Sequence, residues 1–165
     1  MQFSSPKFTH IMLLALVAFV FPACSDDDPT GPGTDTGPGG VTISDLAGTW
    51  NATSFTFTPA GGGTAVDLIA QGGSLVLAIQ ANGDITITQT EPGGAPVVDT
   101  GSLGFDPSDV DFIRLQIDGE PGTDRLAITL TGTTAMTLFE ADSEFDFDDN
   151  GTEDPATLTI VLVKT

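Results

Sequence analysis

The sequence predicts an all-β domain, an antiparallel meander of eight or nine strands that closes into a barrel or packs as a β-sandwich. Apolar residues alternate with polar ones at a period of two, as in a strand with one buried face. Gly-rich turns separate these segments, and the chain has 20 Gly and 11 Pro among 165 residues. No segment shows the 3.6-residue period of an amphipathic helix. Short, regularly spaced strands of this kind are typical of sandwiches and up-and-down barrels.

The clearest strands form a predicted hairpin. Segments 74–80 and 84–88 carry Leu or Ile at every second position, with Thr, Ala or Val between them. Asn82 and Gly83 separate the two segments, and Asn-Gly is the preferred dipeptide of a two-residue type I′ turn. The same alternation predicts further strands at 49–58, 65–69, 97–105, 110–117, 125–131, 133–140 and 156–163. The interior side chains that it predicts are Leu75, Leu77, Ile79, Ile85, Ile87, Leu126, Ile128, Leu130, Leu158, Ile160 and Leu162.

The composition excludes several classes of function. With 4 Lys+Arg against 23 Asp+Glu and a net charge of −19, the chain lacks the basic clusters that bind nucleic acids. His10 and Cys24 are the only His and Cys, and both lie in or beside an N-terminal targeting segment. The domain therefore lacks the residues for Ser-His-Asp or Cys-His catalysis and for His- or Cys-ligated metals. Carboxylate pairs would suit a glycosidase, but one Trp and no Tyr provide few sugar platforms, so we expect no enzyme.

The N-terminus has the pattern of a signal peptide. Residues 11–21 are an unbroken apolar run that is too short to span a membrane and fits the central region of a secretory signal. Phe21, Pro22, Ala23 and Cys24 follow, and a small residue before a cysteine resembles the bacterial lipoprotein signal. The resemblance implies cleavage after residue 23 and attachment of diacylglycerol and fatty acids such as palmitate to Cys24. Phe21 and Pro22 depart from the usual pattern, and the alternative is a plain secretory peptide with an incidental cysteine.

The residues after the cysteine predict a location and a tether. Ser25, where some lipoproteins carry Asp, points to a lipid anchor in the outer membrane, with the periplasmic or surface-exposed side left open. Residues 25–40 hold no side chain suited to a core and are dense in Pro, Gly, Asp and Thr, which predicts disorder. We therefore predict a signal peptide at 1–23, a lipidated Cys and tether at 24–42, and a monomeric β domain at 43–165.

A short motif opens the predicted domain. Gly48, Thr49 and Trp50 form a Gly-x-Trp at the first strand that resembles the opening motif of lipocalins and lipocalin-like domains. The resemblance implies a lipocalin-like β-barrel in which Gly48 allows the turn into the barrel and Trp50 fills its closed end. The lipocalin Thr-Asp-Tyr motif is absent, and no residue clearly matches the arginine that packs across the Trp. The available cations are Arg114, Arg125 and Lys164.

The lipocalin resemblance also implies a function. It predicts a non-catalytic module of the cell envelope that binds a small hydrophobic ligand inside the barrel. Two further interpretations stay open from the residues themselves. The barrel interior can be filled, so that the protein is a structural or surface-interaction domain, and calcium can stabilise that domain.

The calcium hypothesis rests on an acidic loop before the last strand. Oxygen-bearing side chains at alternate positions, followed by Gly151, resemble the first half of an EF-hand calcium loop. The predicted metal ligands are Asp146, Asp148, Asn150, Thr152 and Asp154. The twelfth position is Thr157 instead of the bidentate Glu, which predicts a modest affinity. The alternative is a solvated hairpin turn, because Asp and Asn suit turns.

Overall fold

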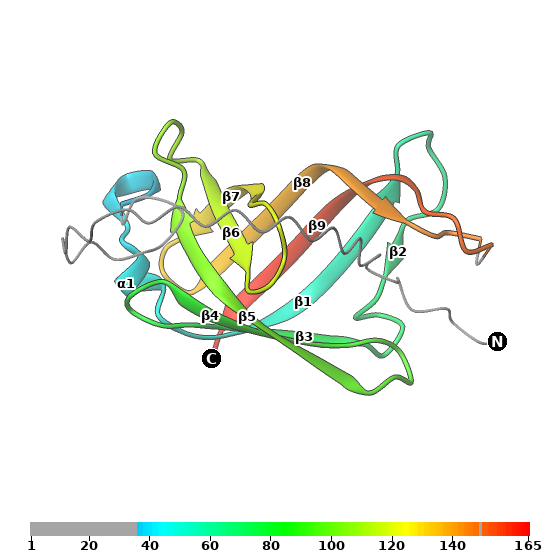
Figure 1. The fold of residues 1–165 in the computed structure, drawn as a ribbon, viewed down its shortest axis with the longest axis horizontal. Coiled ribbons are helices and arrows are strands. Elements are labelled where there is room, and N and C mark those ends of the chain that lie inside the picture. Colours follow the sequence, from blue (N-terminus) through cyan, green and yellow to red (C-terminus); the bar gives the residue numbers. More distant parts are fainter. Residues whose placement is uncertain (1–35, 149) are drawn as a thin grey trace, which may run out of the picture.

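The computed structural model describes residues 36–148 and 150–165, and within them nine antiparallel strands form one sheet. Pairing of β1 with β9 closes this sheet into a barrel (Figure 1). The barrel prediction is therefore confirmed, and the β-sandwich alternative is wrong. Residues 1–23 and Cys24 lie outside the described residues. The strands are β1 (Gly48–Pro59), β2 (Val66–Asp67), β3 (Ser74–Ile79), β4 (Asp84–Thr90), β5 (Pro96–Phe105), β6 (Phe112–Ile117), β7 (Asp124–Thr131), β8 (Ala135–Phe145) and β9 (Asp154–Lys164).

The barrel has eight strands, β1 and β3 to β9, each hydrogen-bonded to its neighbours in chain order. The short β2 adds to the second half of β1, where Phe57 pairs with Val66. One end, which we call the closed end, carries a 3-10 turn, η1 (Pro38–Gly40), and a one-turn helix, α1 (Ile43–Leu46). The opposite end, the open end, carries the β1–β2, β2–β3, β4–β5, β6–β7 and β8–β9 loops (Figure 1).

The segment that covers the closed end was not predicted from the sequence. Thr42 caps α1, since its hydroxyl accepts from the Asp45 N–H at 3.3 Å and its own N–H donates to the Asp45 carboxylate at 2.9 Å. Where the sequence predicts a tether up to residue 42, the structure packs Gly37 so closely on Phe105 that a Cβ would overlap the ring. A helix of four residues is too short to show a period, which is why the sequence pattern did not predict it.

Among the described residues no helix is long and apolar enough to cross a membrane.

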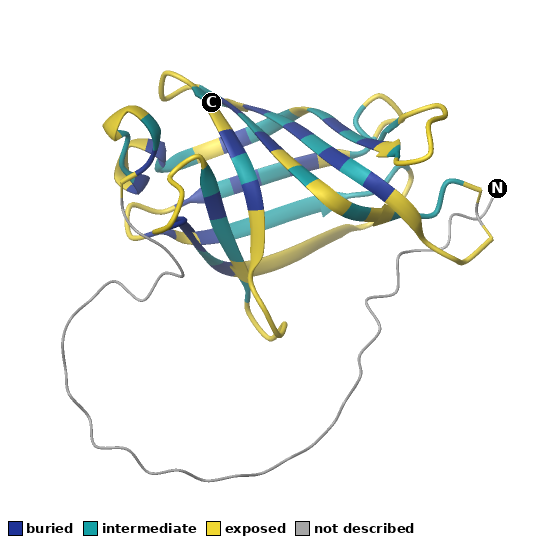
Figure 2. Cartoon of the chain, turned by 90° about the horizontal axis from the view of Figure 1, so that it is seen from above, coloured by how far each residue is buried: buried dark blue, intermediate teal, exposed yellow. Residues whose placement is uncertain are grey.

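The buried apolar residues form one continuous core. Along β3 and β9, buried and partly exposed residues alternate, as the period of two predicts (Figure 2). All eleven predicted interior residues belong to or pack against this core, and only Ile87 and Leu130 are half-buried.

The predicted β3–β4 hairpin is present, but its turn differs. Hydrogen bonds from Gln80 N–H to Asp84 O at 2.8 Å and from Gly83 N–H to Gln80 O at 3.0 Å leave a three-residue loop in place of a type I′ turn. Gly83 has φ +89°, and a Cβ at this position would lie only 2.6 Å from the Leu103 carbonyl oxygen. Gly83 is thus required both by the turn and by its contact with β5.

Candidate functional site

The barrel interior is tightly filled at one end and looser at the other. Trp50 and Phe105, at the closed end, are 0% exposed. Phe57 and Leu158, in the open half, retain 9% and 8% of their accessible surface. Because these side chains all face inward, the open half of the interior keeps slightly more accessible surface than the closed end.

The barrel wall is lower on one side of the open end. The pairing of β5 with β4 begins at Pro96, but its pairing with β6 begins only at Gly101, so the first residues of β5 have a partner strand on one side only. On the other side, β8 pairs with β9 as far as Phe145, whereas its pairing with β7 ends at Phe139. The β4–β5 and β8–β9 hairpins therefore extend past the shorter β6–β7 hairpin (Figure 1). Among the described strands, none pairs with the free edges at 96–99 and 140–145, and we call this stretch of unpaired strand edges the notch.

Aromatic rings gather at the open end. Phe57 stacks on Phe145 with ring centroids 4.5 Å apart, and Phe145 meets Phe147 edge-on at 5.0 Å. Phe145 and Phe147 are half-buried and pack against the core. A pocket of about 700 Å³ has Phe147 in its wall, and its other lining residues are Pro59, Ala60, Gly61, Gly62, Gly63, Thr64, Val66, Asp154 and Pro155. The open end thus combines accessible apolar surface with a pocket of ligand size.

A carboxylate, Glu140, also faces the interior. It continues the inward alternation of Met136 and Leu138 along β8, and it pairs with Leu158, which in turn pairs with Phe57. Burial raises the pKa of Glu140, and the nearby charges of Asp124 and Asp142 raise it further. Sequence reasoning did not select Glu140, although the alternation over 133–140 ends on it and would have placed it inside.

The motif residues meet at the closed end. The Trp50 indole N–H donates to the Leu46 carbonyl at 2.8 Å, which holds the helix over the barrel. Lys164, on the last strand, donates to the Asp45 carbonyl at 3.0 Å, and its ammonium lies 5.6 Å from the Trp50 ring. Gly48 has φ +138°, and a Cβ there would lie 2.7 Å from the Lys164 stem. Of the three cations that the sequence left open, Lys164 is the one that packs across Trp50.

The two arginines converge on one buried carboxylate. Asp106, 1% exposed, accepts from Nε of Arg125 at 2.8 Å and from Nε of Arg114 at 3.2 Å. The hydroxyl and backbone N–H of Ser108, together with both guanidinium groups, hold the pKa of Asp106 far below its usual range. Arg125 also covers the Phe112 ring at 3.4 Å. The cluster is on the outer wall, so we interpret it as structural; nothing in the sequence pattern pointed to it.

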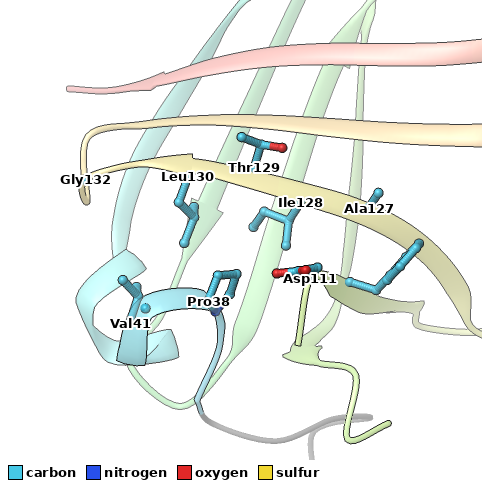
Figure 3. Close-up of a pocket in the computed structure, with 10 residues that line it drawn as sticks. Pro38, Val41, Asp111, Ala127, Ile128, Thr129, Leu130 and Gly132 are labelled. Carbon is cyan, nitrogen blue, oxygen red and sulfur yellow. The ribbon is translucent and has the colours of Figure 1, made fainter. Parts of the chain in front are cut away.

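A second pocket of about 580 Å³ lies at the closed end (Figure 3). Its walls are β7 and the segment that covers the barrel, and its lining is Pro38, Gly39, Val41, Asp111, Phe112, Ala127, Ile128, Thr129, Leu130 and Gly132. We interpret it as the seam between this covering segment and the barrel wall.

The predicted calcium ligands lie together in the β8–β9 loop at the open end. Asp146 accepts from the N–H groups of Asn150 at 3.1 Å and Gly151 at 2.8 Å, and Asn150 accepts from Thr152 N–H at 2.7 Å. These side chains thus bind the loop's own backbone, as in Asx turns. Within the described residues, no three Asp, Glu, His or Cys side chains are arranged to hold a metal. That finding does not count the Asn150 amide or the Thr152 carbonyl, and the calcium site stays a prediction.

Comparisons with known proteins gave likenesses to solved structures. No family model and no curated protein matches the chain. A lipocalin-like protein from Bacteroides uniformis has a TM-score of 0.43 at 14% identity, over 73% of this chain and 99% of its own. Lobster apocrustacyanin A1 has a TM-score of 0.41 at 14% identity, over 73% of this chain and 61% of its own. EF1p2_mFAP2b bound to DFHBI has a TM-score of 0.41 at 19% identity, over 75% of this chain and 100% of its own.

The class of the protein follows from its own topology. Eight antiparallel strands in chain order, closed by the β1–β9 pairing, define a lipocalin-like up-and-down β-barrel. The looser interior, the notch and the aromatic rings all lie at one end of that barrel, so this end is the candidate functional site.

Proposed function

We propose that the protein is a non-catalytic, lipid-anchored barrel of the bacterial outer membrane that binds a small apolar ligand at its open end. The observation that supports this proposal is the row of aromatic rings beside the notch, in which the half-buried Phe145 and Phe147 continue from the buried Phe57. Water in contact with such rings is released when an apolar ligand covers them, at about 25 cal/mol per Å² of apolar surface. The filled closed half would limit the depth to which a ligand enters.

The absence of catalysis is part of the proposal. The described residues contain neither His nor Cys, and their most deeply buried carboxylate, Asp106, is held by two arginines. At the open end Glu140 and Asp124 carry like charges, and Glu140 pairs with the apolar Leu158. A wall of this kind suits binding better than acid–base chemistry.

The ligand proposal can be tested with a neutral apolar probe. We expect the purified protein to bind N-phenyl-1-naphthylamine, with a rise in the probe's fluorescence. Phe145→Ala should weaken binding by about tenfold, because a buried ring contributes more than 1 kcal/mol to an apolar contact. Phe139→Ala is the matched control, since Phe139 lies on the same strand but is 41% exposed, on the outer face.

Equal affinities for the two variants would contradict the location of the site. No binding by the unmodified protein would contradict the function itself. It would favour the alternative, a filled barrel that serves as a surface-interaction domain, with calcium in the 146–154 loop as its stabilising ion.

The anchor is tested by metabolic labelling. We expect cells that produce the full chain to incorporate an alkyne analogue of palmitate into it, because two or three acyl chains on Cys24 would give firm attachment. Cys24→Ser should abolish the label, and Ser25→Ala should keep it. A chain that is never labelled, or a Cys24→Ser chain that is labelled equally, would contradict lipidation at Cys24.

A further inference from the structure

Glu140 lies where the interior of the barrel becomes accessible. Its side chain is half-buried on the inward face of β8, directly after the buried Met136 and Leu138. Among the described residues, no hydrogen bond or ion pair reaches its carboxylate. A carboxylate that has lost part of its water without gaining a partner is unfavourable, and a cation would relieve that cost.

Apolar surface begins one strand away from this carboxylate. Glu140 pairs with Leu158 on β9, and Leu158 pairs with Phe57 on β1, so the three side chains form a row across the interior face. Neighbouring strands are about 4.8 Å apart, which puts the backbones of Glu140 and Phe57, two strands apart, about 10 Å from each other. Phe145 stacks on Phe57 at 4.5 Å and extends the apolar surface. A single small molecule can therefore contact the carboxylate and the rings together.

No cation of the described residues is among the charged groups that act on Glu140. Asp124 and Asp142 are the charged groups that act on Glu140, and both add to its negative potential. The described cations are engaged elsewhere: Arg114 and Arg125 bind Asp106, and Lys164 lies over Trp50. An anionic ligand such as a fatty acid would be repelled here, whereas a cation would be attracted by the carboxylate and by the faces of the rings.

We infer that the ligand of the open end is an amphipathic cation, an organic ammonium whose charged group pairs with Glu140 and whose apolar body covers Phe57 and Phe145. This inference rests on the proposed function and names its ligand class. The notch between β5 and β8 gives such a molecule its entry, because Glu140 lies at the free edge of β8.

Three molecules with one chain length test the inference. Octylammonium, 1-octanol and octanoate differ only in the head group, and each is titrated against the neutral probe on the full protein. We expect octylammonium to bind about tenfold more tightly than octanol, and octanoate to bind most weakly. In Glu140→Gln the preference for octylammonium should fall to about twofold, while octanol binds as before.

Glu144→Gln is the matched control, because Glu144 is exposed on the same strand. This variant should keep the tenfold preference. Glu140→Gln should fold normally, since the loss of a partly desolvated charge favours the folded state, and a thermal melt checks this.

The outcomes separate the inference from the proposed function. Binding of octanol as tight as that of octylammonium would overturn the cation inference and leave the apolar site standing. An unchanged preference for octylammonium in Glu140→Gln would also overturn it. So would an equal loss of that preference in Glu144→Gln, because overall charge would then explain the preference. Failure of all three molecules and of the probe would instead contradict the proposed function.

Discussion

Replacement of Trp50 by alanine is expected to lower the free energy of unfolding by about 3–5 kcal/mol, the usual cost of removing a large buried aromatic ring. Trp50 is 0% exposed and lies between the barrel interior and α1. Its indole N–H also holds the Leu46 carbonyl at 2.8 Å. The variant would lose the packing of the closed end together with this bond. Urea unfolding followed by far-UV circular dichroism measures the change.

Trp50→Phe provides the graded comparison if the alanine variant does not fold. It keeps an apolar ring but loses the hydrogen bond to Leu46, so we expect a cost of about 1–3 kcal/mol. A Trp50→Ala protein as stable as the wild type would contradict the role of Trp50 in holding the closed end together.

Replacement of Asp106 by asparagine is expected to lower the Tm by about 10 °C. The variant keeps the size of the side chain but removes the charge that Arg114, Arg125 and Ser108 hold together at the join of β5, β6 and β7. The two arginine side chains, 40% and 44% exposed, keep part of their hydration, which limits the loss. Asp109→Asn is the control: Asp109 lies 3.6 Å from Arg125 at the surface, and such pairs contribute little.

The effect of Asp106 should depend on pH in a defined direction. The pKa of Asp106 lies well below its ordinary value of 3.8 in the folded protein, so the folded state favours the ionised form. Its contribution is then complete above about pH 4 and is lost as the pH falls toward the folded-state pKa. Thermal melts of wild type and Asp106→Asn should therefore differ most near neutral pH and converge in acid. A Tm difference that grows on acidification would contradict this assignment.

The strands and the interior could be predicted because both are local properties of the chain. Alternation of Leu and Ile over 74–80 and 84–88 fixes which side chains share a face, whatever the rest of the barrel does. The hairpin between these segments was predicted for the same reason. Its turn type was wrong because Gly83 must also approach the Leu103 carbonyl of β5, a neighbour that the local pattern does not contain.

The candidate site could be predicted only in part. Leu158 belonged to the predicted interior, and Glu140, which was not selected, could have been placed on the same face from the alternation that ends on it. The stack of Phe145 on Phe57 was not predictable, because a bulge between Glu140 and Ser143 shifts the register before Phe145. The notch was not predictable either, since it results from the unequal lengths of three hairpins.

The sequence by itself determined the all-β class, the strand positions and the lack of His and Cys in the domain, because composition and a period of two are read from neighbouring residues. Only the tertiary structure decided which residues meet across the barrel. Lys164 reaches Trp50 because the two residues pair where β9 closes on β1, and this closure depends on every strand at once. Arg114 and Arg125 share Asp106 because the register of β6 and β7 pairs the two arginines beside the end of β5.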